Sequence, residues 1–341
     1  MVAANPLHLP VDWDQILSTT MHNYRKEMTD NIFNSRPLLN YLNSNGRVRL
    51  LDGGVSIVEP IIYTEGETQT YAQWDPIDVT PQEGISAAQF QWKQMVGTIA
   101  ISGLEEAQNN GKAAAINLIE AKIMQTEESL KNLLSTMLYA SVPGANDWHS
   151  LVELIDDVVA VGGIDPADPG NDFWKSGVTT ATAVDAAGLE AAMRQAFNTA
   201  SDSGSDRVDS IFAAQDVFEF YESTLTPQVR YTDVSKANLG FQNLMFKNVP
   251  MFWDFDAPAE TMFGLNSKYI GLVMHSQRNF KQSPFTENLS GSFGADAGTA
   301  TPGTTRAGTG LDARVAYIST YGNATVRNRR RCFKITDVSE A

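Results

Sequence analysis

The sequence has a single cysteine, few positive charges and no long apolar run, and each deficit excludes a class of protein. Cys332 is the only cysteine in 341 residues, which excludes an internal disulfide and any metal site built from several cysteines. Lys and Arg number 25 against 40 Asp and Glu, for a net charge of -15. Because contact with phosphates needs clustered Lys and Arg, this balance argues against a general nucleic-acid-binding protein.

Signals for membranes and for catalysis are also missing. No apolar run is long enough to cross a bilayer, and no charged start with an apolar core marks a secretory signal. We therefore expect a soluble protein, made in a reducing cytoplasm, with no membrane partner. The sequence has no phosphate-binding loop, no dinucleotide fingerprint and no zinc-binding HExxH helix. The scattered histidines have no neighbouring ligand at metal spacing: His8, His22, His149 and His275. We expect no enzyme activity, no cofactor and no metal.

One long helix is the most regular element that the sequence predicts, from Lys112 to about Ser141. Proline cannot continue a helix, so Val142-Pro143-Gly144 ends it. Apolar residues three and four positions apart form one stripe, which indicates one buried face: Ile116, Ile119, Ile123, Leu130, Leu134, Met137 and Leu138. Roughly 30 helical residues span about 45 Å, so this stripe needs a broad partner.

A long acidic connection joins two predicted strands, Val55–Tyr63 and Phe90–Ile101, which are rich in β-branched and aromatic residues. A tight hairpin needs only about two to five connecting residues, far fewer than lie here. No Lys or Arg occurs between Arg49 and Lys93, whereas seven acidic residues do: Asp52, Glu59, Glu65, Glu67, Asp75, Asp78 and Glu83. Two interpretations stay open on this evidence, a solvated acidic hairpin and an arm that binds a partner.

Helices and strands alternate from about residue 151 to 283, which is typical of an α/β domain. Asp185 is a plausible N-cap of a helix that runs to about Ala200, with four inward-facing residues: Leu189, Ala192, Ala196 and Phe197. A short helix is predicted over 215–223, strands over 208–213, 262–265 and 269–275, and a pair of strands over 244–253 with its bend near Asn248 and Pro250.

The C-terminal part begins with a segment, 290–310, that is dense in Gly, Ala, Thr and Ser, cannot fill a core and is expected to be a flexible loop. Two final strands, Val315–Tyr321 and Ala324–Ile335, surround Gly322. We expect both beside the Phe90–Ile101 strand and the long helix, so that the second domain is inserted into the first.

The one concentrated positive patch lies near the C-terminus. Arg327, Arg329 and Arg331 alternate in sequence, so on a strand they would share one face. A partner with carboxylates suits them, because arginine forms bidentate pairs with carboxylates. The acidic hairpin of a neighbouring copy is such a partner, in a head-to-tail contact. Lysines that lie off the apolar stripe of the long helix offer a second contact site for a neighbour's acidic hairpin. The candidate inter-subunit residues are Glu65, Glu67, Asp75, Asp78, Arg327, Arg329, Arg331, Lys112 and Lys122.

The order of these elements resembles the major capsid proteins of tailed bacteriophages, whose α+β fold is named after phage Hong Kong 97. Local sequences are similar as well: Glu59-Pro60-Ile61, Phe90-Gln91-Trp92-Lys93, the run from Ile101 to Glu106, and Asn328-Arg329-Arg330. The resemblance implies an N-terminal arm (1–46), an extended loop with its strands (47–101), a peripheral domain with a spine helix (102–150), an axial domain (151–283) and a return to the peripheral domain (284–341).

The resemblance also implies a structural role without catalysis. Many copies, as pentamers and hexamers, would close into an icosahedral shell around packaged double-stranded DNA, assembled in the host bacterial cytoplasm and located in the virion capsid. A portal and a separate scaffolding protein are expected partners, since the arm begins almost at Met1. Some relatives crosslink a loop lysine to a neighbour's asparagine, but Thr64–Gln89 contains no lysine, so we expect non-covalent contacts. Two alternatives are an encapsulin-like shell and an enzyme with its site in the axial domain.

Overall fold

The computed structural model describes residues 36–77, 79–81, 83–108, 118–201, 206–225, 244–287 and 313–340. The predicted N-terminal arm up to residue 35, Asp78, Lys112 and the predicted 290–310 loop lie outside these residues. The chain divides into two compact units. The first comprises Met1–Ile32, Ile99–Gln125 and Phe285–Val315, and the second Phe33–Thr98, Thr126–Pro284 and Ala316–Ala341.

A six-stranded mixed sheet is built around one long strand, β13 (Ala313–Val326). The order β1–β10–β13–β11 runs from β1 (Val48–Leu51) through β10 (Ile270–His275) and β13 to β11 (Lys281–Gln282), and β4 (Lys93–Ser102) and β12 (Thr286–Glu287) also pair with β13. β1 is parallel to β10 and β13 is antiparallel to it. The predicted pairing of the late strand with the 90–101 region is therefore confirmed.

The sequence predicted that Gly322 separates two strands, but Gly322 lies inside the single strand β13. A Cβ atom there would lie 2.4 Å from the carbonyl oxygen of Val273 and 2.6 Å from the ring of Trp148. Glycine at this position lets the buried indole of Trp148 pack directly on the strand, which a turn-like residue pattern does not reveal.

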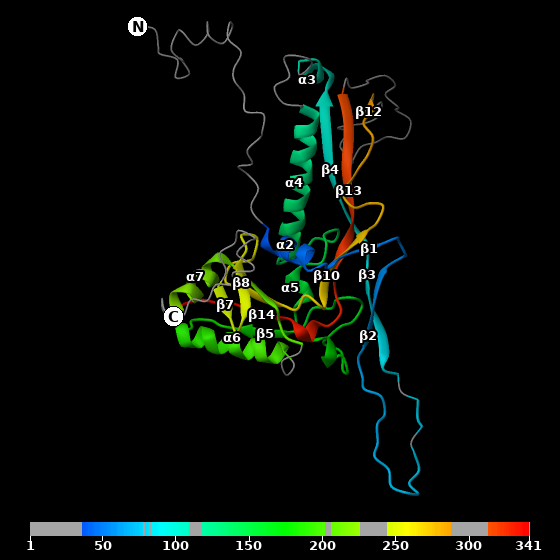
Figure 1. The fold of residues 1–341 in the computed structure, drawn as a ribbon, viewed down its shortest axis with the longest axis vertical. Coiled ribbons are helices and arrows are strands. Elements are labelled where there is room, and N and C mark those ends of the chain that lie inside the picture. Colours follow the sequence, from blue (N-terminus) through cyan, green and yellow to red (C-terminus); the bar gives the residue numbers. More distant parts are fainter. Residues whose placement is uncertain are drawn as a thin grey trace, which may run out of the picture. The chain divides into compact units, whose positions relative to one another are not determined.

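The second unit also contains a six-stranded sheet in the order β5–β14–β9–β6–β8–β7. Its strands are β5 (Gly177–Thr180), β14 (Phe333–Thr336), β9 (Met262–Leu265), β6 (Ser210–Ala213), β8 (Val249–Trp253) and β7 (Leu244–Phe246). Helix α6 (Ala186–Ala200) packs on β5 and β14, and α7 (Gln215–Thr224) packs on β8, as Figure 1 shows. The predicted Asp185 cap is confirmed, because its carboxylate accepts from the backbone N–H of Gly188 at 2.7 Å.

Two predicted strand positions are wrong. The segment Ala324–Ile335 is not one strand: Arg329–Arg331 form the short 3-10 helix η3, and β14 after it pairs with β5 and β9, away from β4. The 269–275 strand, placed by sequence among the α/β strands, pairs instead with β1 and β13. Residue alternation indicates that a segment is a strand, but not which distant strand it pairs with.

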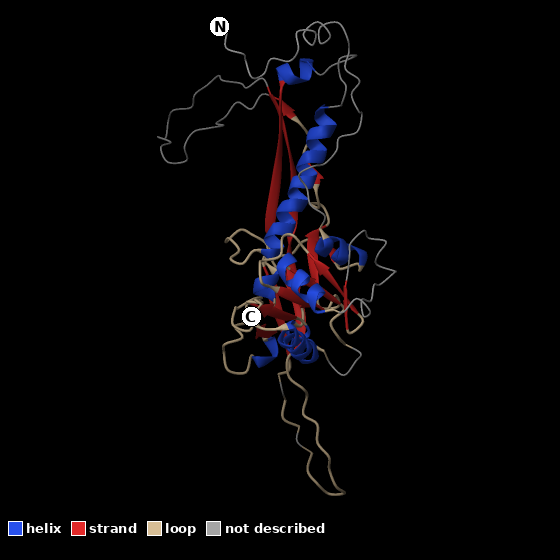
Figure 2. Cartoon of the chain, turned by 90° about the vertical axis from the view of Figure 1, so that its left-hand side faces the viewer, coloured by secondary structure: helices blue, strands red, loops and turns tan. Residues whose placement is uncertain are grey.

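The predicted acidic hairpin is confirmed as a two-stranded ribbon of β2 (Ile57–Ile62) and β3 (Ile85–Phe90), with Ile57 opposite Phe90 and Ile62 opposite Ile85. The predicted strand Phe90–Ile101 corresponds to β4, which begins at Lys93, whereas β3 lies almost wholly in the stretch that the sequence predicted to be a loop. Beyond the ribbon the chain continues as a long loop that extends away from the sheets of the second unit (Figures 1 and 2).

Helix α4 (Leu118–Tyr139) is the described part of the predicted long helix. Its stripe is buried in the C-terminal half, at Leu130, Leu134 and Leu138, whereas Ile119 and Ile123 are half-buried. Part of the expected broad partner is β4: a Cβ atom on Gly97 would lie 2.5 Å from the Thr126 side chain and 3.2 Å from that of Leu130. The small residue on β4 thus allows close packing of helix on strand.

Candidate functional site

Glu59 anchors the acidic hairpin to the β13 sheet. Its carboxylate is only 1% exposed and accepts from the Arg49 guanidinium of β1. It also accepts from Arg327 Nε at 2.9 Å, just past the end of β13, and from the Thr325 hydroxyl at 3.3 Å. A buried carboxylate is tolerated only when paired in this way. Glu59 was counted among the acidic residues of the hairpin in the sequence, but in the structure its carboxylate stabilises the fold.

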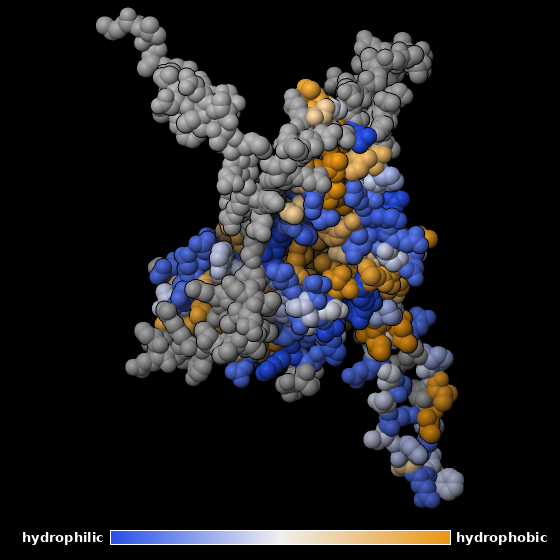
Figure 3. Space-filling view, turned by 45° about the horizontal axis from the view of Figure 1, so that its top comes forward, coloured by the Kyte–Doolittle hydropathy of each residue, from blue (hydrophilic) through white to orange (hydrophobic). Residues whose placement is uncertain are grey.

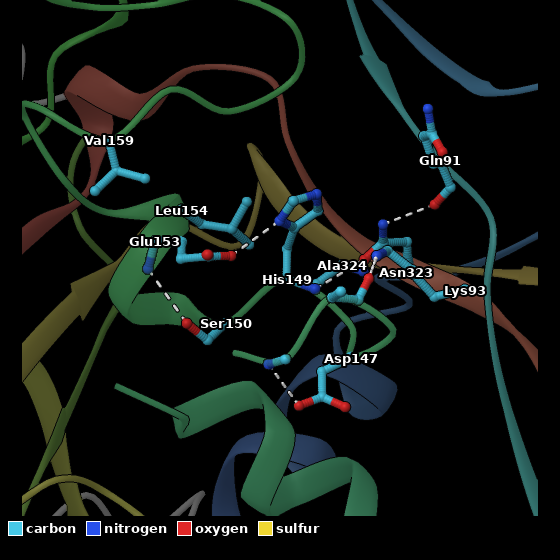
Figure 4. A network of polar contacts seen from close by, with 12 residues as sticks. Gln91, Lys93, Asp147, His149, Ser150, Glu153, Leu154, Val159, Asn323 and Ala324 are labelled. Atoms are coloured by element: carbon cyan, nitrogen blue, oxygen red, sulfur yellow. Dashed lines mark hydrogen bonds and ion pairs between the residues drawn. The ribbon is translucent and has the colours of Figure 1, made fainter. Parts of the chain in front are cut away.

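A second polar network fixes the break between β3 and β4 (Figure 4). Asn323 of β13 is fully buried, and its side-chain oxygen accepts from the backbone N–H groups of His149 at 3.0 Å and Ala324 at 2.9 Å. Its amide nitrogen donates to the carbonyl of Gln91 at 2.8 Å. One side chain thus satisfies backbone groups of three segments, and it fixes the point from which the hairpin leaves the sheet. The imidazole of His149 lies 3.0 Å from Glu153.

The loop between β2 and β3 presents its acidic residues to solvent. Glu65, Glu67 and Asp75 are all exposed, while Asp78 lies outside the described residues. Asp75 also orders its own turn, because its carboxylate accepts from the backbone N–H of Ala72 at 2.9 Å. These residues therefore lie where a second molecule could meet them, on a part of the loop with local structure.

Large apolar side chains are also exposed on the hairpin and its loop, which the pattern of charged residues did not indicate. Trp74 is 94% exposed and Tyr71 66%. Along the ribbon, Ile62 and Ile85 lie opposite each other and are both exposed, and Figure 3 shows apolar surface on the hairpin and its loop. An aromatic pair in a segment of turn-forming residues was the available sequence signal. Exposed groups of this kind mark interaction surfaces.

The three alternating arginines do not share one face. Arg329 is fully buried and donates to the carbonyl groups of Leu154, Val159 and Glu153 at 2.9, 3.0 and 2.9 Å. Burial lowers the pKa of Arg329 to about 10. The expectation of a single arginine face is wrong because the strand ends at Val326 and the helical turn η3 rotates the following side chains.

The other candidate cations have intramolecular partners. Arg327 pairs with Glu59, and Arg331 Nε lies 3.9 Å from Asp206. In the first unit, Lys122 donates to the Ala100 carbonyl at 2.9 Å and pairs with Glu105 at 2.9 Å. The hydrogen bond from Lys122 lowers the pKa of the Glu105 carboxyl. Lys112 lies outside the described residues.

Two adjoining pockets in the second unit collect positive charge from distant parts of the sequence. The smaller, of about 160 Å³, is lined by Arg47, Arg49, Lys268 and Arg327 beside β10. The larger, of about 540 Å³, shares Lys268, Tyr269 and Arg327 with it and adds Arg330. Of the residues that the structure describes, no Asp or Glu lines either pocket, but Glu59 pairs with Arg49 and Arg327, and Asp206 lies 3.6 Å from Lys268. Sequence reasoning missed this cluster because its members come from three separate segments.

Aromatic rings form the wall of the larger pocket. Tyr63, Phe173 and Trp174 line it together with Tyr269. The ring centroids of Tyr63 and Phe173 are 5.4 Å apart, and those of Phe173 and Trp174 are 6.2 Å apart. The ammonium group of Lys268 lies 5.1 Å from the centroid of the Tyr269 ring. This combination of rings and cations suits a ligand that is both aromatic and acidic.

The described part of the chain holds no group of three His, Cys, Asp or Glu side chains arranged to bind a metal ion. Among the helices that the structure describes, none combines the length and apolar character needed to cross a membrane.

Comparison with known proteins shows the fold. No family model matches the sequence, and no curated protein matches it. Among solved structures, the chain is similar to the capsid asymmetric unit of cyanophage A-1(L), with a TM-score of 0.62, 16% identity, and 95% of this chain and 99% of that chain covered. The capsid of the native GTA particle has a TM-score of 0.61 and 9% identity, with 94% and 96% covered. The capsid of Myoviridae phage XM1 has a TM-score of 0.54 and 11% identity, with 92% and 96% covered. The chain therefore has the mixed α+β fold of phage capsid proteins.

Proposed function

We propose that this chain is a major capsid protein of a tailed bacteriophage, whose copies assemble into an icosahedral shell around packaged double-stranded DNA. The observation that carries this proposal is the extent of the structural match, 95% of this chain and 99% of the cyanophage capsid chain. Because nearly all residues of both chains are covered by the match, the likeness concerns the whole architecture and not one common domain. The role is structural and needs no catalytic group.

In this proposal the parts take the names used for the Hong Kong 97 fold. The arm is 1–46, the extended loop and its strands are 47–101, and α4 is the spine helix of the peripheral domain over 102–150. The axial domain is 151–283, and 284–341 returns to the peripheral domain. The pairing of β14 with β5 and β9 modifies this scheme, because the C-terminal segment then completes the axial sheet.

The partners follow from the same proposal. Copies of the chain form pentamers and hexamers, with a separate scaffolding protein and a portal, in the host bacterial cytoplasm, and the finished shell is the virion capsid. The hairpin of one copy meets a neighbour: Glu65, Glu67, Asp75 and Asp78 face the basic surface that contains Arg327. Arg329 leaves the proposed contact set because it is buried. Lys112 and Lys122 remain a second contact site, at which Lys122 would exchange Glu105 for a neighbour's carboxylate.

Assembly is the direct test. The purified chain, alone and together with its scaffolding protein, is expected to form closed particles tens of nanometres across in negative-stain electron microscopy. Particles that enclose a protein cargo, from a genome without DNA-packaging genes nearby, would contradict the phage assignment. Monomers alone under every assembly condition, scaffold included, would contradict a shell protein altogether.

A further inference from the structure

We propose that the tip of the hairpin loop, Tyr71–Asp75, inserts into the larger basic pocket of a second copy of this chain. Trp74 would lie against the aromatic wall and the carboxylate of Asp75 would face Lys268 and Arg330. The inference rests on the proposed shell function and adds to it the two surfaces that meet.

The tip has the form of an inserting group. The carbonyl of Ala72 accepts from the backbone N–H groups of Trp74 at 2.8 Å and Asp75 at 3.0 Å, and the carboxylate of Asp75 accepts from the N–H of Ala72 at 2.9 Å. These bonds hold a tight turn that displays the indole, which is 94% exposed. Tryptophan is among the residues that most often dominate protein–protein binding, because it buries a large apolar area with few rotatable bonds.

The pocket matches that group in size and chemistry. Its volume of about 540 Å³ lies within the range of roughly 300–1,000 Å³ that is usual for binding clefts. The half-buried rings of Tyr63 and Phe173 offer faces and edges to an indole, and the buried ring of Trp174 lies behind that of Phe173. At the rim, Lys268 has a side chain that is 64% exposed and Arg330 is also exposed. Arg330 can therefore reach a carboxylate that arrives with the indole, and Lys268 would exchange Asp206, which lies 3.6 Å away, for that carboxylate.

Charge makes the pairing directional. The pockets are lined by five cations and by no acidic residue in the described part of the chain: Arg47, Arg49, Lys268, Arg327 and Arg330. Glu59 pairs with Arg49 and Arg327, and Asp206 lies 3.6 Å from Lys268, so five cations face two carboxylates and the surface stays basic. The loop from Thr64 to Gln89 has acidic residues and no Lys or Arg. Like charges would repel in a loop-to-loop or pocket-to-pocket contact, whereas loop-to-pocket is attractive. Such a contact is head-to-tail, the type that closes rings of identical subunits.

A second copy is required, because the pocket lies at the base of the same hairpin whose loop carries the tip. Pro60, Ile61, Ile62 and Tyr63 line the pocket, and the stretch from Tyr63 to Trp74 spans up to about 40 Å when extended. In the structure the loop extends away from that base (Figure 1), and Trp74 is uncovered. The tip of one chain is thus remote from its own pocket and available to another.

Photocrosslinking in assembled particles tests the insertion. Trp74 is replaced by p-benzoylphenylalanine, an aromatic that can still insert, and particles are formed from a mixture of unlabelled and heavy-isotope-labelled chains. After illumination, mass spectrometry should find mixed-isotope crosslinks from position 74 to peptides that contain Phe173–Trp174, Lys268–Tyr269 or Asn328–Arg330. Crosslinks to other surfaces, crosslinks within one chain, or none would overturn the inference.

Matched variants supply a second test. Trp74→Ala should lower the yield of closed particles by at least about tenfold, as expected for a central interface residue, and Lys268→Glu with Arg330→Glu should do the same. Val79→Ala is the control, since Val79 is 85% exposed on the same loop, and its yield should stay within about twofold. Arg327 is left unchanged because it holds Glu59.

The two proposals fail in different ways. If the wild-type chain forms no closed particles, the shell function is wrong. If the wild-type chain assembles and Trp74→Ala assembles equally well, only the insertion is wrong. Urea unfolding of the unassembled chains must match the wild type for a loss of particles to count, and the exposure of Trp74 and Val79 leads us to expect that match.

Discussion

Asp254 shows how a single buried side chain joins elements that are remote in sequence. Its carboxylate is 1% exposed and accepts from the backbone N–H of Leu38 in α2 (Pro37–Ser44) at 3.4 Å. It also accepts from the hydroxyl of Tyr139, the last residue of α4, at 3.2 Å, and from the N–H of Asp256 at 3.2 Å. These donors are neutral. Burial therefore dominates and raises the pKa of Asp254 to about 6, with the nearby charge of Asp256 acting in the same direction.

The raised pKa predicts how stability depends on pH. The folded chain binds this proton more tightly than the unfolded chain does, so the stabilising contribution is complete below about pH 4 and is lost as the pH rises through about 6. Asn cannot titrate. The stability of Asp254→Asn relative to the wild type should therefore improve by roughly 2–3 kcal/mol between pH 4 and pH 7.5.

Urea unfolding at several pH values measures this difference. Asp52→Asn is the control, because Asp52 is exposed and should show no such trend. A difference between wild type and Asp254→Asn that stays constant with pH would show that Asp254 does not titrate in this window.

Arg329 is a buried cation, although its place in a basic run of the sequence suggested that it lies on the surface. Its guanidinium satisfies three carbonyl groups around α5 (Leu151–Leu154) and lies 5.9 Å from the ring centroid of Trp174. Through these hydrogen bonds Arg329 connects the turn η3 to the α5 region. Its neighbour Arg330 is the one that points to solvent.

At the scale of elements, the acidic hairpin combines a rigid base with an exposed loop. Glu59, Arg49 and Arg327 form the base, and the Asn323 network fixes the bend at Gln91. The Ile62–Ile85 pair lies near the outer end of the ribbon, past which the described loop residues are largely exposed. A firm base lets the loop reach a partner without unfolding the sheet.

Removing the charge of Glu59 should loosen the ribbon. In Glu59→Gln the guanidinium groups of Arg49 and Arg327 lose their anionic partner, so backbone amides of β2 and β3 should exchange with deuterium at least about tenfold faster. Hydrogen exchange followed by mass spectrometry measures this over 57–62 and 85–90. Glu65→Gln, which changes an exposed carboxylate, should leave the exchange unchanged, and equal exchange in both variants would refute the anchoring role.

At the scale of the whole molecule, the excess of negative charge is consistent with the proposed shell around DNA. A net charge of -15 limits adhesion to nucleic acid and to other molecules, while the local basic pockets are the proposed place of specific contacts between copies. Attraction therefore depends on where the charges lie and not on their sum.

The composition of the hairpin loop predicts how copies are held together in the proposed shell. Thr64–Gln89 has no lysine, so the loop has no amine for an isopeptide bond to a neighbour. Mature particles boiled in denaturing detergent should give a single band near 37.3 kDa. A ladder of higher bands would show covalent links between copies and would contradict the non-covalent contacts.

Much of the local structure was predictable from the sequence. The α4 stripe, the Asp185 cap of α6, the helix α7 and the strand β2 all follow from periodicity and capping, which act between residues close in the chain. The acidic character of the loop needed only a count of charges. The order of these elements was enough to indicate the fold class.

Tertiary structure alone decided the pairing of distant segments. Strand alternation does not specify a partner, so the places of β10 and β14 were misjudged. Side-chain burial depends on what packs around a residue, which is why Arg329 looked like a contact and is a core residue. The basic pockets arise only when the segments around Arg47, Lys268 and Arg327 come together. The sequence by itself determined local conformation and charge, whereas the folded chain determined which charges remain on the surface.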